Sequence, residues 1–282
     1  MLKYLVIFEE YPYDPFINVA LDESLLLAIE MRLISIPILR IWRNNKSVVI
    51  GRNTNVVNEV RIDKLKRYGI PLIRRISGGG AVYHDLGNYN YTLVIPTESR
   101  LSIDYVYGHL LKGILLALNT LGIEAWIEND TDVIANGFKV SGNSAIVKKN
   151  VALLHGTLLV NTDLNILCQV LKPNVNLVRK RGYTLTKYRV ANLNYLVGKE
   201  LKPEIIISSL IDSFSKVLGA EPIITMCSDT ILEIAEILSK YRYRDPNWNW
   251  YKCENFNIWK RVLKIIENSK RDKQGICNLL RT

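Results

Sequence analysis

The amino-acid sequence predicts an α/β (α+β) fold in which mixed, largely antiparallel sheets are flanked by helices. Short apolar stretches typical of strands alternate with stretches whose apolar residues recur at helical spacing. Between residues 125 and 160, several strand-like stretches follow one another without a helix, which favours an antiparallel meander over βαβ crossovers. No G-x-G-x-x-G follows a predicted strand, so a dinucleotide-binding fold has little support.

The individual elements follow from periodicity and from the residues that start or stop them. Strands are expected at residues 3–8, 38–42, 47–51, 70–77, 90–96, 124–128, 131–135, 138–142, 144–149 and 151–160. Helices are expected at residues 18–33, 60–69, 103–122, 203–219 and 228–241, with further helical structure around 244–261. The first of these is interpreted as an amphipathic packing helix. Gly69 should stop the second, Asn136-Gly137 is a strong hairpin signal, and Asp163 should cap the helix that follows it.

Composition and charge exclude several classes of function. The 282 residues are 48% hydrophobic and 23% charged, which is ample material for a core. No apolar run is long enough for a bilayer and no cleavage site follows Met1, so no membrane partner and no signal peptide are expected and the protein should be cytoplasmic. Four separated cysteines and three histidines lack metal-site spacing. The net charge of +10 favours an acidic or phosphorylated partner, but without a nucleic-acid-binding motif no nucleic acid is expected.

Three consecutive glycines follow the strand at 70–77, and they require an explanation because glycine loses much chain entropy when its conformation is fixed. Ser77 offers a hydroxyl, and Gly78, Gly79 and Gly80 expose backbone N–H groups without side-chain cover. Such a loop can form a nest for an anion or a carboxylate. The alternative is a tight turn between strands, which explains one or two glycines better than three.

Charged and ionisable residues flank this loop. Arg74 and Arg75 alternate faces if the strand continues, so one would point to the ligand and the other to solvent. His84 either lines the same site or is a satisfied core or surface histidine. The sequence alone leaves both interpretations of His84 open.

A second group of candidate residues lies in the predicted meander. Asn129 and Asp130 stand on a predicted turn. Lys139 lies on a strand with apolar neighbours, where it is either a solvated outer-face charge or a functional cation. His155, with a glycine beside it, interrupts an apolar strand and therefore requires a partner or a ligand.

Taken together and in order, these stretches give a chain that resembles the lipoate–protein ligase A family, within the wider biotin/lipoate ligase group. The resemblance covers roughly residues 13–251 and implies a biotin/lipoate ligase-like catalytic domain. Lys139 and His155 are sixteen positions apart, as the family pattern expects. The segments that carry the resemblance are "YDPFINVALDESLL", "LRIWRNNKSVVIGRNTN", "RRISGGGAVYHDLGN", "EAWIENDTDVI", "FKVSGNSA", "HGTLLVNTDL", "LKPNVNLVRKRGYTLTKYRVANL" and "WNWY".

The resemblance implies an adenylating ligase. Members of the family activate lipoate with ATP to form lipoyl-AMP and pyrophosphate, and then transfer the lipoyl group to one lysine of a lipoyl domain, releasing AMP. The implied cofactors are ATP and Mg²⁺, with lipoate as the substrate. The implied partners are the lipoyl domains of 2-oxoacid dehydrogenase E2 subunits and the glycine cleavage H protein, with a small accessory ligase subunit in some relatives.

The resemblance also implies residue roles, position by position. Lys139 would be catalytic, with its ammonium group between the acyl oxygen and the α-phosphate. Asn129 and Asp130 would bind the adenylate end, and Asp130 would also contact Mg²⁺. The lipoyl and phosphate pocket would be lined by Arg74, Ser77, Gly78, Gly79, Gly80, Ala81, His84, Gly142, His155 and Thr157.

The chain departs from the family pattern in two places. Full-length members continue into an accessory domain, whereas here residues 1–255 are expected to form the catalytic domain and residues 256–282 only a short helical tail. Adenylation would then need a separate accessory subunit, or the chain would use preformed lipoyl-AMP. The segment around Ser144 and Ile146 also differs from the family, so the choice between lipoate and octanoate stays open.

An octanoyl or lipoyl transferase that works without ATP is the main alternative. The cysteine-using type needs a nucleophilic cysteine shortly before the lysine motif, and none lies between Glu124 and Lys139. The other octanoyltransferase type keeps a lysine and remains open. An intact Lys139 and glycine loop argue against a non-catalytic binder of lipoyl domains or nucleic acid. The basic stretch 172–189, with Lys180 and Arg181, is expected to steer acidic lipoyl domains to the site.

Overall fold

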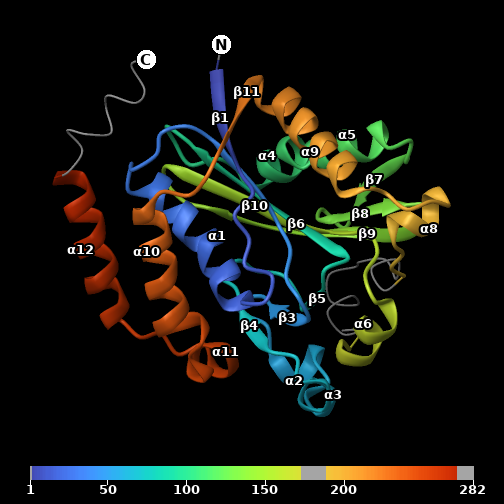
Figure 1. The fold of residues 1–282 in the computed structure, drawn as a ribbon, viewed down its shortest axis with the longest axis horizontal. Coiled ribbons are helices and arrows are strands. Elements are labelled where there is room, and N and C mark those ends of the chain that lie inside the picture. The colour runs from blue at the N-terminus through green and yellow to red at the C-terminus, as the bar shows by residue number, and fades with distance from the viewer. Residues whose placement is uncertain (1, 173–188, 272–282) are drawn as a thin grey trace.

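The computed structural model describes residues 2–172 and 189–271, and an eight-stranded sheet forms its centre (Figure 1). The strand order is β11-β1-β2-β6-β10-β9-β8-β7. β1 pairs in parallel with β11 and β2, and the remaining pairs are antiparallel, so the predicted mixed, largely antiparallel sheet is confirmed. The strands are β1 Leu2–Ile7, β2 Ile38–Trp42, β6 Asn88–Pro96, β7 Ala125–Glu128, β8 Asp132–Ala135, β9 Phe138–Val147, β10 Val151–Leu159 and β11 Ala220–Thr225.

Helices cover both faces of this sheet and enclose two apolar cores (Figure 1). On one face α5 Lys112–Thr120 and α9 Pro203–Leu218 pack against it. On the other face α1 Pro15–Glu30 lies against the sheet, with α10 Asp229–Leu238 and α12 Asn257–Arg271 outside it. The amphipathic interpretation of the first helix is wrong, since 13 of the 16 residues of α1 are buried. A helix enclosed by a sheet and by other helices is buried nearly all round, so it has no broad solvent-facing polar side.

A second sheet of three strands carries the glycine loop. Its order is β4-β3-β5, with β3 at Ser47–Ile50, β4 at Leu72–Arg74 and β5 at Val82–His84. A third apolar core lies beneath it, to which four short helices contribute. They are α2 Val56–Glu59, α3 Ile62–Tyr68, α6 Leu164–Val170 and α11 Pro246–Tyr251. The loop that joins β4 to β5 therefore projects from a packed support.

Local signals set several element boundaries as predicted. Gly69 ends α3 with φ 62°. Asn136 and Gly137 join β8 to β9 with φ 50° and 75°, as a type I′ hairpin turn requires. The Asp163 side chain accepts a hydrogen bond of 3.0 Å from the N–H of Ile166 and caps α6.

Other elements differ from the prediction. The helix expected at 103–122 is divided into α4 Ile103–Tyr105, a π-helical turn at Val106–Leu110, and α5. The strands expected at 138–142 and 144–149 are one strand, β9. Periodicity misses β5, α2 and α8 Leu193–Val197, because each is short, and it also misses β11. Within the described ranges, no helix has both the length and the apolar character needed to cross a membrane.

Candidate functional site

A cavity lies between α1, the glycine loop and the large sheet. Strand register places five of its lining residues in one row, which crosses the neighbouring strands β2, β6, β10, β9 and β8. Trp42 lies beside Asn90, Asn90 beside Thr157, and Gly142 beside Asp132. The N–H of Gly142 donates to Oγ1 of Thr157 at 3.4 Å and closes the row. Because strands lie about 4.8 Å apart, this row spans roughly 19 Å, which suits an elongated ligand.

Lys139 stands at one end of this row. Its Nζ atom lies 2.6 Å from Oδ1 of Asp132, a buried carboxylate. The backbone N–H of Lys139 donates to the carbonyl of Arg189 at 2.6 Å. The neighbouring turn contains Asn129 and Asp130, both in left-handed conformations with φ 52° and 65°. Asn129 places Nδ2 3.5 Å from Oδ2 of Asp132, whereas Asp130 is exposed. One ammonium group and one buried carboxylate therefore define this end.

The glycine loop is held by its carbonyl groups. The Gly78 carbonyl accepts from Nη2 of Arg75 at 2.6 Å, and the Gly79 carbonyl accepts from Oγ1 of Thr54 at 2.8 Å. Gly79 has φ 88°, and a Cβ there would lie 2.7 Å from Nη2 of Arg75, so only glycine fits. Among the described residues, the N–H groups of Gly78, Gly79 and Gly80 have no acceptor. The loop is thus fixed while its donors remain available to an anion.

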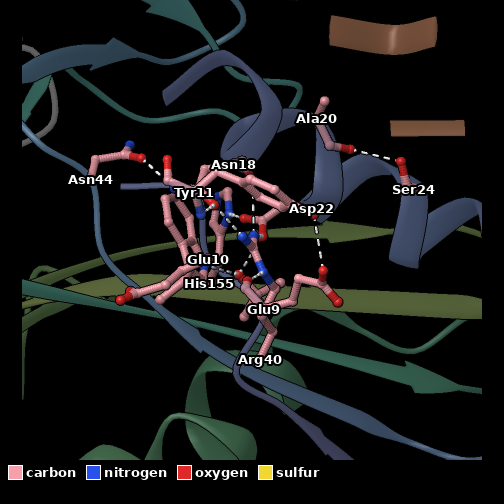
Figure 2. Close-up of polar contacts among 12 residues, drawn as sticks. Glu9, Glu10, Tyr11, Asn18, Ala20, Asp22, Ser24, Arg40, Asn44 and His155 are labelled. Atoms are coloured by element: carbon pink, nitrogen blue, oxygen red, sulfur yellow. Dashed lines mark hydrogen bonds and ion pairs between the residues drawn. The ribbon is translucent and has the colours of Figure 1, made fainter. Parts of the chain in front are cut away.

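His155 joins the glycine loop to α1. Its Nε2 atom lies 2.6 Å from Oγ of Ser77. Its Nδ1 atom lies 3.0 Å from Oδ2 of Asp22, and Figure 2 shows these two residues. The other carboxylate oxygen of Asp22 accepts from Nη1 of Arg40 at 2.9 Å and from Oγ1 of Thr92 at 2.8 Å. Arg40 is fully buried, and this burial lowers its pKa. A buried network therefore ties α1, the large sheet and the loop together.

The two adjacent arginines have different environments, and neither faces solvent. Arg75 lines the cavity, and burial lowers its pKa to about 10, so it stays cationic at neutral pH. Arg74 is 2% exposed and lies outside the cavity lining. Its guanidinium group donates to the backbone carbonyls of Gly51, Arg52, Thr54, Trp248, Asn249 and Trp250. Arg74 thus connects β4 to α11, and the arginine that reaches the cavity is Arg75.

His84 lies beyond Trp42, at the end of the cavity away from Lys139. Its ring is 4% exposed and meets the Trp42 ring edge-on at 5.9 Å between centroids. Burial, reinforced by the nearby Arg75, lowers the pKa of His84 to about 3, so the ring is neutral. Its Nδ1 atom lies 3.2 Å from Nδ2 of Asn44, and its Nε2 atom has no partner among the described residues.

Residues 14–215 match the family model of the lipoyl protein ligase A/B catalytic domain, and the match includes every residue that lines the cavity. The chain belongs to this family. The resemblance inferred from the sequence and the assignment of the chain as a ligase enzyme are confirmed.

Similar proteins extend over nearly the whole chain. It is 31% identical over 254 residues to lipoate-protein ligase A subunit 1 of Thermoplasma acidophilum, covering 85% of this chain and 94% of that protein. A structure of the bi-partite lipoate protein ligase of T. acidophilum, described with its E2 lipoyl domain, aligns with a TM-score of 0.79 and 28% identity over 90% of this chain and 99% of that chain.

Two ligand-bound structures are also similar. A lipoate-protein ligase A bound with ATP aligns with a TM-score of 0.77 and 29% identity, over 89% of this chain and 99% of that one. A T. acidophilum lipoate protein ligase with bound lipoic acid aligns with a TM-score of 0.76 and 28% identity, over the same shares. The fold class expected from the sequence is that of these ligases.

In this lipoyl protein ligase A/B domain, the structure brings together most of the predicted site residues. The cavity lining contains Gly79, Gly80, Ala81, His84, Lys139, Gly142, His155 and Thr157. Outside the lining lie Arg74, Ser77, Gly78, Asn129 and Asp130. Sequence reasoning missed other lining residues, among them Val19, Asp22, Trp42, Val49, Asn143 and Ser144. Of the two adjacent arginines it assigned Arg74 to the pocket, whereas Arg75 lines the cavity. Asp22 could have been found, because a carboxylate in a helix that is buried nearly all round requires a buried partner.

The ligase domain offers limited means of holding a metal ion by itself. The described residues contain no group of three or more His, Cys, Asp or Glu side chains suited to a metal. Mg²⁺ at nucleotide sites needs only one or two carboxylates together with phosphates. Asp130, exposed on the turn beside the Lys139 end, fits that requirement, whereas Asp132 is paired with Lys139.

Proposed function

We propose that this chain is the catalytic subunit of an ATP-dependent lipoate–protein ligase, which forms lipoyl-AMP and transfers the lipoyl group to a lysine of lipoyl domains. One observation carries the proposal most directly. A single elongated cavity joins an apolar end, with Val19, Trp42 and Val49, to an end with the Lys139 ammonium group. A medium-length acyl chain with an anionic head has the matching shape and charge. The lipoic acid and ATP in the similar ligase structures support the same assignment.

The first half-reaction joins two anions. A carboxylate oxygen of lipoate attacks the α-phosphorus of ATP, and the bond from that phosphorus to pyrophosphate breaks. Cationic and N–H groups must offset the repulsion between the reactants. Arg75, Lys139 and the N–H groups of the glycine loop supply these groups. We assign to Lys139 an exchange of its Asp132 partner for a phosphate oxygen when the nucleotide binds.

The second half-reaction uses the same cation. The neutral amine of the acceptor lysine attacks the acyl carbon of lipoyl-AMP, the bond between that carbon and the phosphate oxygen breaks, AMP leaves, and the nitrogen loses a proton. Negative charge develops on the acyl oxygen and then on the departing phosphate. Lys139, close to both, stabilises each in turn.

Further assignments are part of the proposal. When bound, Mg²⁺ would neutralise charge on the pyrophosphate, and we assign Asp130 to hold it. Residues 1–255 would form the catalytic domain and 256–282 a helical tail. The described part of this tail is α12, whose Ile258 and Val262 lie in the core beside α10. We place the activity in the cytoplasm, where ATP is available.

The proposed partners follow from the similar proteins and from the reaction. The T. acidophilum relatives are a bi-partite ligase and a "subunit 1", which supports a separate accessory subunit for adenylation. The acceptors would be lipoyl domains of 2-oxoacid dehydrogenase E2 subunits and the glycine cleavage H protein. The stretch expected to steer them is the basic stretch 172–189. Its positions 173–188, which include Lys180 and Arg181, lie outside the described residues.

The test combines the purified chain, a lipoyl domain and three acyl donors, with the acceptor weighed by mass spectrometry. Lipoate with Mg-ATP is tested with the chain alone and with an added accessory subunit, and it should release pyrophosphate and lipoylate the acceptor in at least one of these two mixtures. Preformed lipoyl-AMP should lipoylate it without ATP. Transfer from an octanoyl carrier protein in the absence of ATP would instead support the acyltransferase alternative. Failure with lipoyl-AMP would contradict the proposed function.

A further inference from the structure

The end of the cavity at Trp42 contains hydrogen-bond donors that have no acceptor among the described residues. His84 is buried, and its Nε2 atom has no partner in the described part of the chain. The Nδ2 atom of Asn90, which also lines the cavity, has none either. The surrounding side chains of Val19 and Val49 are apolar and offer no acceptor.

The protonation of His84 is set by a chain of hydrogen bonds that begins at Arg40. Figure 2 shows the first members of this chain, Arg40, Asn18 and Asn44. Arg40 can only donate, and its Nη2 atom lies 2.6 Å from Oδ1 of Asn18, which also accepts from the N–H of Tyr11. The amide nitrogen of Asn18 therefore donates to Oδ1 of Asn44 at 2.8 Å. Asn44 in turn presents its nitrogen to Nδ1 of His84, 3.2 Å away. Nδ1 must accept, so the proton of the neutral ring is on Nε2.

His84 is therefore a permanent neutral donor at this end of the cavity. Burial lowers its pKa to about 3, which keeps the ring uncharged at neutral pH. A ligand that covers Nε2–H without accepting from it leaves a buried donor unpaired, which costs roughly 5- to 150-fold in affinity. The ligand that suits this end has a weak, polarisable acceptor within an otherwise apolar group.

The orientation of the ligand follows from the charges. Lys139 lies at the opposite end of the row and attracts the carboxylate or acyl phosphate. An extended acyl chain then directs its far end toward Trp42 and His84. A thioether-like sulfur is a weak hydrogen-bond acceptor, whereas a terminal methyl group accepts nothing.

We propose that His84, assisted by Asn90, donates a hydrogen bond to a dithiolane sulfur of the lipoyl group and is the residue that selects lipoate over octanoate. This inference rests on the proposed function. It assigns to His84 a specificity role beyond lining the pocket.

The first test uses the full wild-type chain and three ligands in calorimetric titrations. They are lipoate, octanoate and 5-cyclopentylpentanoate, which keeps the ring and chain of lipoate but lacks sulfur. Lipoate should bind about tenfold more tightly than either analogue, as one unpaired buried donor predicts. Equal affinities for lipoate and 5-cyclopentylpentanoate would overturn the inference and leave the proposed function intact. If none of the three ligands binds, the proposed function is contradicted, and the inference with it.

The second test replaces the donor. In His84→Leu, octanoate should bind up to about tenfold more tightly and lipoate less tightly, so that the preference for lipoate falls to near one. His109→Leu is the matched control, since His109 lies outside the cavity lining and stacks on Tyr105. It should keep the wild-type preference. If His84→Leu lowers the affinities for lipoate and octanoate by the same factor, His84 has only a structural role and the inference fails.

Discussion

The carboxylate of Asp22 on α1 lies 3.0 Å from Nδ1 of His155 on β10, and the same carboxylate is paired with Arg40. Asp22→Asn would leave the buried Arg40 without a counter-charge. We expect the free energy of unfolding to fall by roughly 3–5 kcal/mol, measured by urea denaturation. Glu254→Gln is the control: it breaks the partly exposed pair with Arg52 and should cost less than about 1 kcal/mol. A loss below about 1 kcal/mol in Asp22→Asn would contradict the buried pair.

Lys139→Ala tests the proposed catalytic cation. We expect lipoyl transfer to fall at least about 100-fold, because charge developing in both half-reactions loses its stabilising donor. Acceptor mass spectrometry measures transfer, and circular dichroism checks the fold. Lys148→Ala removes a lysine that is paired with Glu30 outside the cavity, and it should transfer at the wild-type rate. Activity of Lys139→Ala within about tenfold of wild type would remove Lys139 from this role.

Gly79→Val tests the glycine loop as a wall of the cavity. The new side chain would meet Nη2 of Arg75 at 2.7 Å in a backbone conformation with φ 88°, so lipoate affinity should fall more than about tenfold. Gly137→Ala is the matched control, since φ there is 75° but no atom lies within 4 Å. It should lose about 1–2 kcal/mol of stability and keep its lipoate affinity. Wild-type affinity in Gly79→Val would show that the ligand lies elsewhere.

Arg74→Met tests the assignment of Arg74 to structure rather than to substrate. Several buried carbonyl groups would lose their donor, so the free energy of unfolding should fall by roughly 3 kcal/mol or more. Arg67→Met, on the exposed side of α3, should change it by less than about 0.5 kcal/mol. Urea denaturation compares the two. Equal stability of both variants would be incompatible with the observed contacts.

His84 should make the protein sensitive to acid. Its pKa is about 3 in the folded state, against an ordinary value of 6.5, so between these pH values the unfolded state binds the extra proton. Stability from this group is therefore complete above pH 6.5 and is lost as pH falls toward 3. Between pH 6 and 4, His84→Leu should flatten the dependence of the unfolding free energy on pH by about 1.4 kcal/mol per pH unit. If the unfolding free energies of the wild-type protein and of His84→Leu change with pH in parallel, the buried neutral ring of His84 is contradicted.

Much of the fold could be predicted because its signals are local. The Asn136-Gly137 turn and the Gly69 stop act through their own backbone conformations. The missed elements depend on distant partners: β11 is a short edge strand whose only neighbour in the large sheet, β1, lies at the other end of the chain. The Pro222 within it also weakens a strand prediction, although an edge strand tolerates proline.

The residues of the site also divide into those with a local sequence signal and those whose position depends on distant partners. Lys139, His155 and the glycines were found because charged, ionisable and flexible residues interrupt apolar stretches. Arg74 and Arg75 are adjacent, and alternation along a strand indicates only that they diverge. Which of them reaches the cavity depends on α11, since Asn249 supplies acceptors that retain Arg74. No local pattern around Arg74 carries that information.

The contact between Arg74 and Asn249 also sets an order of events during synthesis. The N–H of Arg74 donates to Oδ1 of Asn249 at 2.8 Å across 175 positions, and Trp248 donates back to the Arg74 carbonyl. At translation rates of about 5–20 residues per second, roughly 9–35 s separate the making of these two residues. Until Asn249 leaves the ribosome, the strand that carries the glycine loop lacks its clamp. The nascent ligase therefore cannot complete the support of its glycine loop before the chain has been made as far as Asn249.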